Sequence, residues 1–148
     1  FWMGGLVALA TALAKSGFIA WIAKLIGTAV AAANMGWIAS FVLISLIYIY
    51  SHYCFASVTA RISAMYAAFV AVAAACGVPA MLVVITFGCF ANLPISLTHY
   101  GNGCGPVYFG AGYVSQGEWW RNGFIITTIN VVIWLTIGMA WWKFIGLY

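Results

Sequence analysis

The fold of this chain is decided by the stretch SHYCFASVTAR (Ser51–Arg61), which lies in the middle of an apolar run from Trp37 to Cys76. A straight helix over those 40 residues would be about 60 Å long, roughly twice the hydrocarbon thickness of a membrane. The polar stretch therefore indicates a break in the run. Its apolar flanks, 37–51 and 62–76, have about 15 residues each and are short for full crossings, so we predict a re-entrant helical hairpin.

The composition excludes a soluble globular domain. Of the 148 residues, 67% are hydrophobic and only 4% are charged, whereas about a quarter of the residues of a soluble domain are charged. Several apolar runs are long enough to span a bilayer. We therefore predict an all-α, integral, multi-pass membrane protein. The net charge of +4 comes from cations scattered singly, so we expect no binding of nucleic acid.

A second interruption lies further along the chain, at SLTHYGNGCGP (Ser96–Pro106). Its three glycines allow the backbone to unwind and to approach a ligand closely. Interrupted helices at membrane depth present unpaired N–H groups that suit carboxylates or phosphates, and a pair of them is typical of the substrate site of a secondary transporter. No acidic residue lies near the loop, so an anion is a more natural ligand than a cation.

These landmarks divide the chain into five segments. We expect the end of a transmembrane helix at 1–14, an interfacial arm helix at 15–35, the re-entrant hairpin at 36–78 with its tip near 57–59, a broken transmembrane helix at 79–114 with an unwound loop at 95–106, and an interfacial connection with the final transmembrane helix at 115–148. Because the chain starts inside an apolar run without an initiator methionine, we expect an N-terminally truncated fragment of a longer protein.

Three strings extend this interpretation, namely HYCFASVTARISAMYAAF (52–69), NLPISLTHYGNGCGPVYFGAGYVSQGEWWRNGF (92–124) and WWKFIGLY (141–148). Through them the chain resembles the divalent anion:sodium symporter family, and within it the branch of 2-oxoglutarate/malate and related di- and tricarboxylate translocators. The resemblance implies the second of two inverted repeats in a homodimeric secondary transporter. The implied partners are di- or tricarboxylate anions, the missing N-terminal repeat, a second copy and the lipid bilayer.

The resemblance also implies which residues bind the substrate. The predicted set is Ser57, Thr59, Arg61, Thr98, His99 and Asn102. In this family the hairpin tip carries a Ser-Asn-Thr-like motif that contacts a substrate carboxylate and helps to form a sodium site. Here Val58 replaces the asparagine and offers no side-chain oxygen. We therefore expect no cofactor, disfavour a sodium ion, and favour anion exchange over sodium symport.

Arg61 is a second departure, because the family pattern has a histidine or a neutral residue at this position. A charge within an apolar run is costly and marks a functional hypothesis by default. Two interpretations stay open: the permanent cation near the tip strengthens carboxylate binding, or it anchors the hairpin.

The sequence thus predicts a secondary active transporter of small dicarboxylates such as 2-oxoglutarate, malate or succinate, working by alternating access. We expect it in a bacterial inner membrane, with a plastid inner envelope as the alternative. Sodium-coupled di- or tricarboxylate symport, an anion channel and a non-transporting membrane subunit remain as alternative functions. An enzyme is disfavoured because the candidate pair of Cys104 and His99 forms no recognised motif, and the four cysteines have no CxxC spacing that would indicate a metal site.

Overall fold

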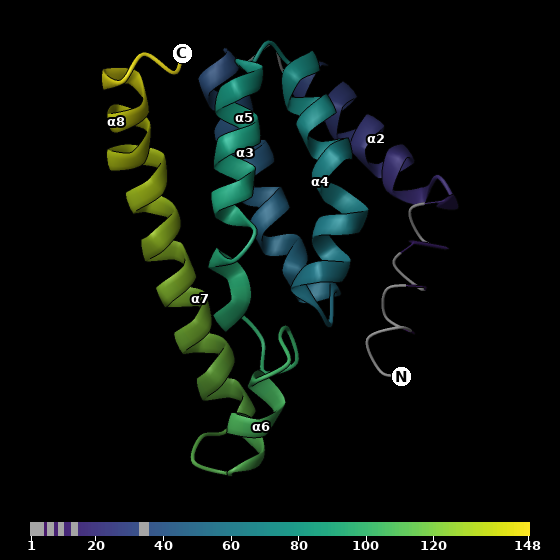
Figure 1. The fold of residues 1–148 in the computed structure, drawn as a ribbon, viewed down its shortest axis with the longest axis vertical. Coiled ribbons are helices and arrows are strands. Elements are labelled where there is room, and N and C mark those ends of the chain that lie inside the picture. The colour runs from purple at the N-terminus through teal and green to yellow at the C-terminus, as the bar shows by residue number, and fades with distance from the viewer. Residues whose placement is uncertain (1–4, 6–7, 9–10, 13–14, 33–35) are drawn as a thin grey trace.

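The computed structural model describes residues 5, 8, 11–12, 15–32 and 36–148, and the regular structure of these residues is entirely helical (Figure 1). Its elements are α2 (Phe18–Ala32), α3 (Trp37–Tyr50), the 3₁₀ turn η1 (Ser51–Cys54), α4 (Val58–Ala75), α5 (Ala80–Phe90), the 3₁₀ turn η2 (Leu93–Ser96), α6 (Gly105–Gly110), α7 (Gln116–Ile133), the π-helical η3 (Trp134–Gly138) and α8 (Met139–Phe144). The all-α prediction is confirmed. Most of the predicted helix end at 1–14, and residues 33–35 of the predicted arm, lie outside the described residues.

Among the described residues, three stretches are long and apolar enough to cross a membrane: Trp37–Cys54, Val58–Ala75 and Gln116–Phe144. The first two have 18 residues each, because α3 continues into η1 and α4 begins at Val58 rather than at residue 62. The arms of the predicted hairpin are therefore longer than the sequence suggested. Helices of this length fit two full membrane crossings as well as a re-entrant hairpin. The re-entrant hairpin therefore stays a prediction.

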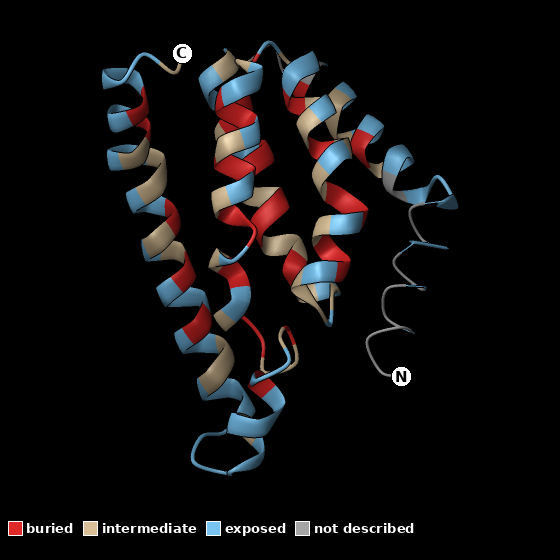
Figure 2. Ribbon diagram, in the orientation of Figure 1, coloured by how far each residue is buried: buried red, intermediate tan, exposed pale blue. Residues whose placement is uncertain are grey.

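The core lies where α3, α4 and α5 pack together, as the buried residues in Figure 2 show. Its centre is aromatic: the Tyr48 ring stacks on Phe87 with the ring centroids 4.7 Å apart, and Phe69 lies 5.7 Å from Tyr48 on another side. Lipid tails are as apolar as these side chains, so close packing rather than escape from water holds such helices together in a membrane.

The last three elements, α7, η3 and α8, continue one another as a long helix beside the central helices (Figure 1). A capping box starts it: the Ser115 N–H donates to Glu118 at 2.8 Å, and the Ser115 hydroxyl accepts from the Glu118 N–H at 3.4 Å. This box satisfies N–H groups that the first turn of a helix otherwise leaves free. The helix therefore begins directly after Ser115, where the sequence predicted an interfacial connection.

Gly123 lets α7 approach the broken segment at η2. A Cβ atom at this position would overlap the carbonyl oxygen of Ser96 and lie 3.1 Å from Cα of Leu97. Two contacts flank this approach: the hydroxyls of Ser96 and Thr127 lie 3.4 Å apart, and those of Tyr50 and Thr128 lie 2.6 Å apart. The long helix thus contacts the end of α3, directly before the first interruption, and η2 at the start of the second.

We predict that Gly123→Ala destabilises the protein by about 2 kcal/mol, because the added methyl group meets backbone that cannot rotate away. Gly117→Ala is the matched control in the same helix, since it faces no atom within 4 Å. This control should be neutral or gain up to about 1 kcal/mol from helix propensity. Thermal unfolding of both purified variants measures the difference, and equal stabilities would contradict the close approach at η2.

Candidate functional site

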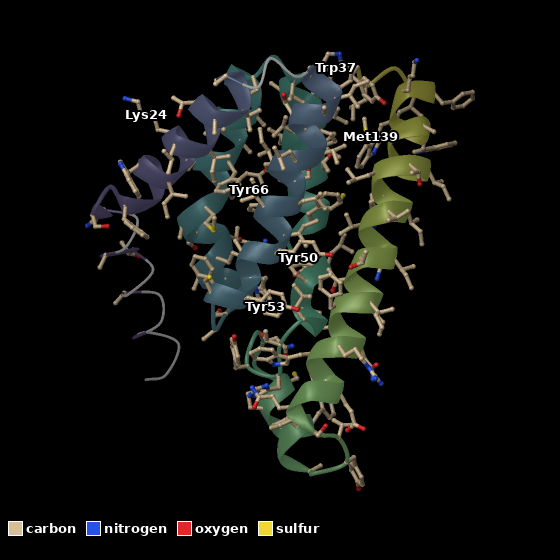
Figure 3. The ribbon with its side chains drawn as sticks, turned by 180° about the vertical axis from the view of Figure 1, so that it is seen from behind. Lys24, Trp37, Tyr50, Tyr53, Tyr66 and Met139 are labelled. Atoms are coloured by element: carbon tan, nitrogen blue, oxygen red, sulfur yellow. The ribbon has the colours of Figure 1, made fainter. Side chains whose placement is uncertain are left out.

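The two polar interruptions lie side by side. Tyr100 of the second donates its hydroxyl to the carbonyl oxygen of Tyr53 in the first, at 2.9 Å. Trp120 of α7 packs against both residues, with ring centroids 5.8 Å from Tyr53 and 6.4 Å from Tyr100. Figure 3 shows Tyr53 at the end of α3, next to the loop that follows η2. The break between α3 and α4 and the break between α5 and α6 therefore form one polar region.

Arg61 lies on the first turn of α4, and its side chain is fully buried. One terminal nitrogen donates to the carbonyl oxygen of Tyr48 at 3.0 Å, and the other donates to the carbonyl oxygens of Phe90 at 3.2 Å and Ala91 at 2.6 Å. The guanidinium carbon also lies 4.6 Å from the centroid of the Tyr48 ring, a cation–π contact. These acceptors belong to the last turn of α3 and to the end of α5.

The position of Arg61 has a clear physical reason. The last carbonyls of a helix lack partners within the helix and carry partial negative charge, which a buried cation neutralises. The single acidic residue of the sequence, Glu118, is instead engaged with Ser115. Arg61 is thus held by backbone dipoles in the described structure, which favours the interpretation that it anchors the hairpin. A direct bond from Arg61 to a substrate stays a prediction.

The predicted tip residues lie at the amino end of α4. Ser57 is the N-cap, half-buried, and its hydroxyl accepts from the Ala60 N–H at 3.5 Å. Thr59 is exposed in the described structure. The first N–H groups of this 18-residue helix point into the break and bring the positive end of its dipole there.

Two of the predicted loop residues build the loop itself. The side-chain amide of Asn102 donates to the Ile95 carbonyl at 3.0 Å and accepts from the N–H groups of Cys104 at 2.8 Å and Gly105 at 2.7 Å. Asn102 thus starts α6. His99 accepts from the indole N–H of Trp120 at 3.3 Å, and its ring stacks on Phe109 at a centroid distance of 4.3 Å. A substrate contact by either residue stays a prediction.

Thr98 differs from its neighbours in the loop. Its side chain is fully buried, and its hydroxyl has no hydrogen-bond partner among the described residues. The same holds for both ring nitrogens of His52, which lies in η1 and was not in the predicted set. One sign in the sequence indicated His52 as a site residue, namely its place within the first interruption. Its burial could not be predicted, because it depends on the loop around Gly101 in the second interruption. The structure therefore brings together Thr98, which was predicted, and His52, which was not.

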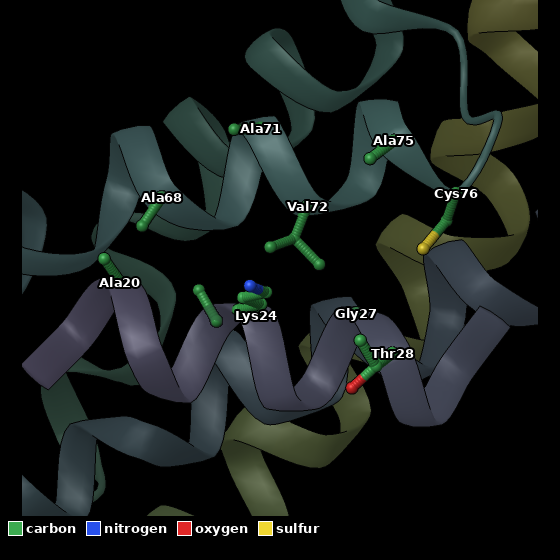
Figure 4. A pocket seen from close by; sticks show the side chains of 10 residues that line it. Ala20, Lys24, Gly27, Thr28, Ala68, Ala71, Val72, Ala75 and Cys76 are labelled. Carbon is green, nitrogen blue, oxygen red and sulfur yellow. The ribbon is translucent and has the colours of Figure 1, made fainter. Parts of the chain in front are cut away.

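An open groove of about 470 Å³ lies elsewhere, between α2 and α4 (Figure 4). Small residues such as Ala23, Gly27, Ala68 and Ala75 line it, and Lys24 is the one charged residue of the lining. This groove gathers no set of polar donors of the kind that an anion site needs. The polar region at the two breaks is the better candidate.

The chain matches a known family of membrane proteins over its whole length. The model of the sodium:sulfate symporter transmembrane region matches residues 1–148. Among curated proteins, the chain is 44% identical over 147 residues to dicarboxylate transporter 1, chloroplastic, of Spinacia oleracea, and 44% identical over 147 residues to a putative malate transporter of Bacillus subtilis. It is 35% identical over 142 residues to an inner membrane protein of Escherichia coli.

These alignments cover 96–99% of this chain but 26–30% of the relatives. The chain thus spans between a quarter and a third of the length of the curated relatives that it matches. Each relative contains further sequence that this chain does not represent.

We predict that Arg61→Met destabilises the protein by about 3 kcal/mol, because the carbonyls of Phe90 and Ala91 lose their side-chain donor inside the core. Arg61→Lys should recover only part of this loss, since one ammonium group does not reproduce the planar fork of the guanidinium. Arg121→Met is the matched control, because Arg121 is exposed on α7. Thermal unfolding in detergent measures all three, and an Arg61→Met protein as stable as the control would contradict the anchoring role.

Proposed function

Because the chain belongs to the sodium:sulfate symporter family, we propose that the whole protein is a secondary active transporter of small dicarboxylates. This is the family that the sequence motifs resemble, the divalent anion:sodium symporters. Family membership identifies a membrane transporter rather than an enzyme. The relatives named as a dicarboxylate transporter and a putative malate transporter support this class of substrate. The observation that carries the proposal is the meeting of two helix breaks around buried, neutral donors.

The local charge of the site favours an anion. The guanidinium of Arg61 is buried beside the breaks, and the amino end of α4 adds the positive end of a helix dipole. The single carboxylate of the sequence, that of Glu118, is exposed at the start of α7. A dicarboxylate therefore meets positive potential and hydroxyl donors without a competing negative charge.

We assign different tasks to the six predicted residues. Thr98 and Ser57 are proposed to contact the substrate, with Thr59 beside them at the tip. His99 and Asn102 hold the shape of the loop, and Arg61 holds the ends of α3 and α5 and acts on the substrate through its charge. The hydrogen bonds that these last three residues make within the chain support this division.

Anion exchange is the proposed mode of transport, with alternating access as its mechanism. A preceding repeat and a second copy of the protein are proposed to complete the transporter, in a bacterial inner membrane or a plastid inner envelope. Sodium-coupled symport is the second candidate, because the family description names sodium. Val58 at the tip argues against it, since valine offers no oxygen ligand.

We predict saturable exchange of labelled malate, 2-oxoglutarate or succinate by the full-length protein in liposomes loaded with unlabelled dicarboxylate. An imposed sodium gradient should not change the rate. Uptake that requires sodium would support the second candidate instead. Flux without saturation and without counter-substrate would contradict a transporter and indicate a channel.

In the same liposomes, Thr98→Ala and Ser57→Ala should each raise KM about tenfold, because each removes one hydrogen bond to a charged group. Thr136→Ala is the control, since this exposed hydroxyl bonds only to carbonyls of its own helix in the described structure, Val132 at 2.6 Å and Ile133 at 3.4 Å. Unchanged KM values in both site variants would contradict the assignment of the site.

A further inference from the structure

His52 is a buried polar side chain of the first interruption. Its exposed fraction is 0%, and neither ring nitrogen has a partner among the described residues. A buried donor or acceptor without a partner costs stability, and such groups in folded proteins call for an explanation. By contrast, the other histidine, His99, accepts a bond from Trp120. The two histidines therefore have different tasks.

His52 and Thr98 converge on one point of the second interruption. A Cβ atom at Gly101 would overlap Nε2 of His52 and lie 2.7 Å from the hydroxyl oxygen of Thr98. The two unpartnered groups come from separate breaks of the chain and face the same glycine. The other unpartnered side-chain oxygens, those of Ser45 and Tyr48, both lie within α3. The remaining unpartnered atom is Nε of Arg61, whose terminal nitrogens are already bonded to backbone carbonyls. Among the described residues, the pair at Gly101 thus brings together a free imidazole and a free hydroxyl from the two interruptions.

Gly101 lies directly against both groups. Because His52 and Thr98 are fully buried and Gly101 lies against the His52 ring, a ligand reaches Nε2 only after the loop has shifted. A glycine at this place makes the closed arrangement possible, since any side chain would prop the loop away from His52. The structure thus shows the pair covered, in a loop that a substrate would have to displace.

We propose that His52 is a substrate-contacting residue, which with Thr98 binds one carboxylate group of the dicarboxylate once the loop at Gly101 has moved. This assignment rests on the proposed function. The imidazole N–H and the threonine hydroxyl are two neutral donors, and a carboxylate accepts from both. The buried guanidinium of Arg61 on the neighbouring first turn of α4 favours an anion over a cation at this place.

The test compares His52→Leu with His52→Gln in the full-length protein. His52→Leu removes polar atoms that have no partner, so its melting temperature without substrate should match or exceed that of wild type. Its KM for malate or 2-oxoglutarate should rise about tenfold or more, and the stabilisation of wild type by added substrate should disappear. His52→Gln places an amide nitrogen near the site of Nε2, so its KM should stay within about threefold of wild type.

His99→Leu is the matched control for a structural histidine. It breaks the bond to Trp120, so its melting temperature should fall. If His52→Leu loses stability like His99→Leu, fails to fold, or keeps the wild-type KM, the assignment of His52 is overturned while the proposed function stands. If the wild-type protein shows no saturable dicarboxylate transport, the proposed function fails and this assignment fails with it.

Two glycines of the same loop give an independent test. The methyl group of Gly101→Ala would overlap the His52 ring, whereas that of Gly103→Ala would meet no atom within 4 Å. We expect Gly101→Ala to change KM or the transport rate about tenfold, and Gly103→Ala to stay within about twofold of wild type. Equal effects of the two substitutions would show that the loop does not close on His52, and would overturn the proposed pair.

Discussion

The structure depends on the three hydrogen bonds that the Arg61 side chain donates to backbone carbonyls. Helix breaks inside a membrane free carbonyl groups that no water satisfies, and such backbone persists only where protein provides partners. Arg61 supplies donors to the end of α5 and to the last turn of α3 at once. Without this cation, the carbonyls of Phe90 and Ala91 would lose their side-chain donor in the core, whereas that of Tyr48 would keep the Ser51 hydroxyl, which donates to it at 2.7 Å. Arg61 thus holds both breaks in place, and the position of the loop after η2 depends on this anchor.

The polar residues around the breaks fall into two groups with opposite tasks. Arg61, Asn102 and His99 use their hydrogen-bonding groups within the chain and thereby hold a rigid frame. Thr98 and His52 are buried at the same place, and their side chains have no hydrogen-bond partner in the part of the chain that the structure describes. A binding site benefits from this separation, because the frame keeps its shape while the free donors keep their capacity for a ligand. Substitutions in the first group should therefore lower stability, whereas substitutions in the second group should weaken substrate binding.

Much of the architecture was predictable from local sequence. The polar stretch at Ser51–Arg61 and the glycine-rich stretch at Ser96–Pro106 indicated the two breaks, because clusters of polar residues and glycines interrupt apolar membrane helices. The spacing of Ser115 and Glu118 is that of a capping box, but the start of the last helix at this point was not predicted from it. The family followed from longer motifs that the comparison confirmed.

What the sequence did not indicate depends on contacts between distant residues. The acceptors of Arg61 are backbone atoms, and one of them lies 30 positions away in the chain, so no side-chain pattern reveals them. The burial of His52 requires Gly101 to lie against it, a contact across two loops. The arm lengths of 36–78 were misjudged because the capping serine at Ser57 starts α4 earlier than hydrophobicity alone suggests.

A cryo-electron microscopy structure of the full-length protein with bound malate or 2-oxoglutarate tests the proposed site most directly. A carboxylate group of the substrate should lie beside Thr98 and His52, with the loop at Gly101 displaced. Arg61 should still bind the carbonyls of Phe90 and Ala91. A carboxylate bound directly to the Arg61 guanidinium, or a substrate located away from the two breaks, would contradict the proposed site.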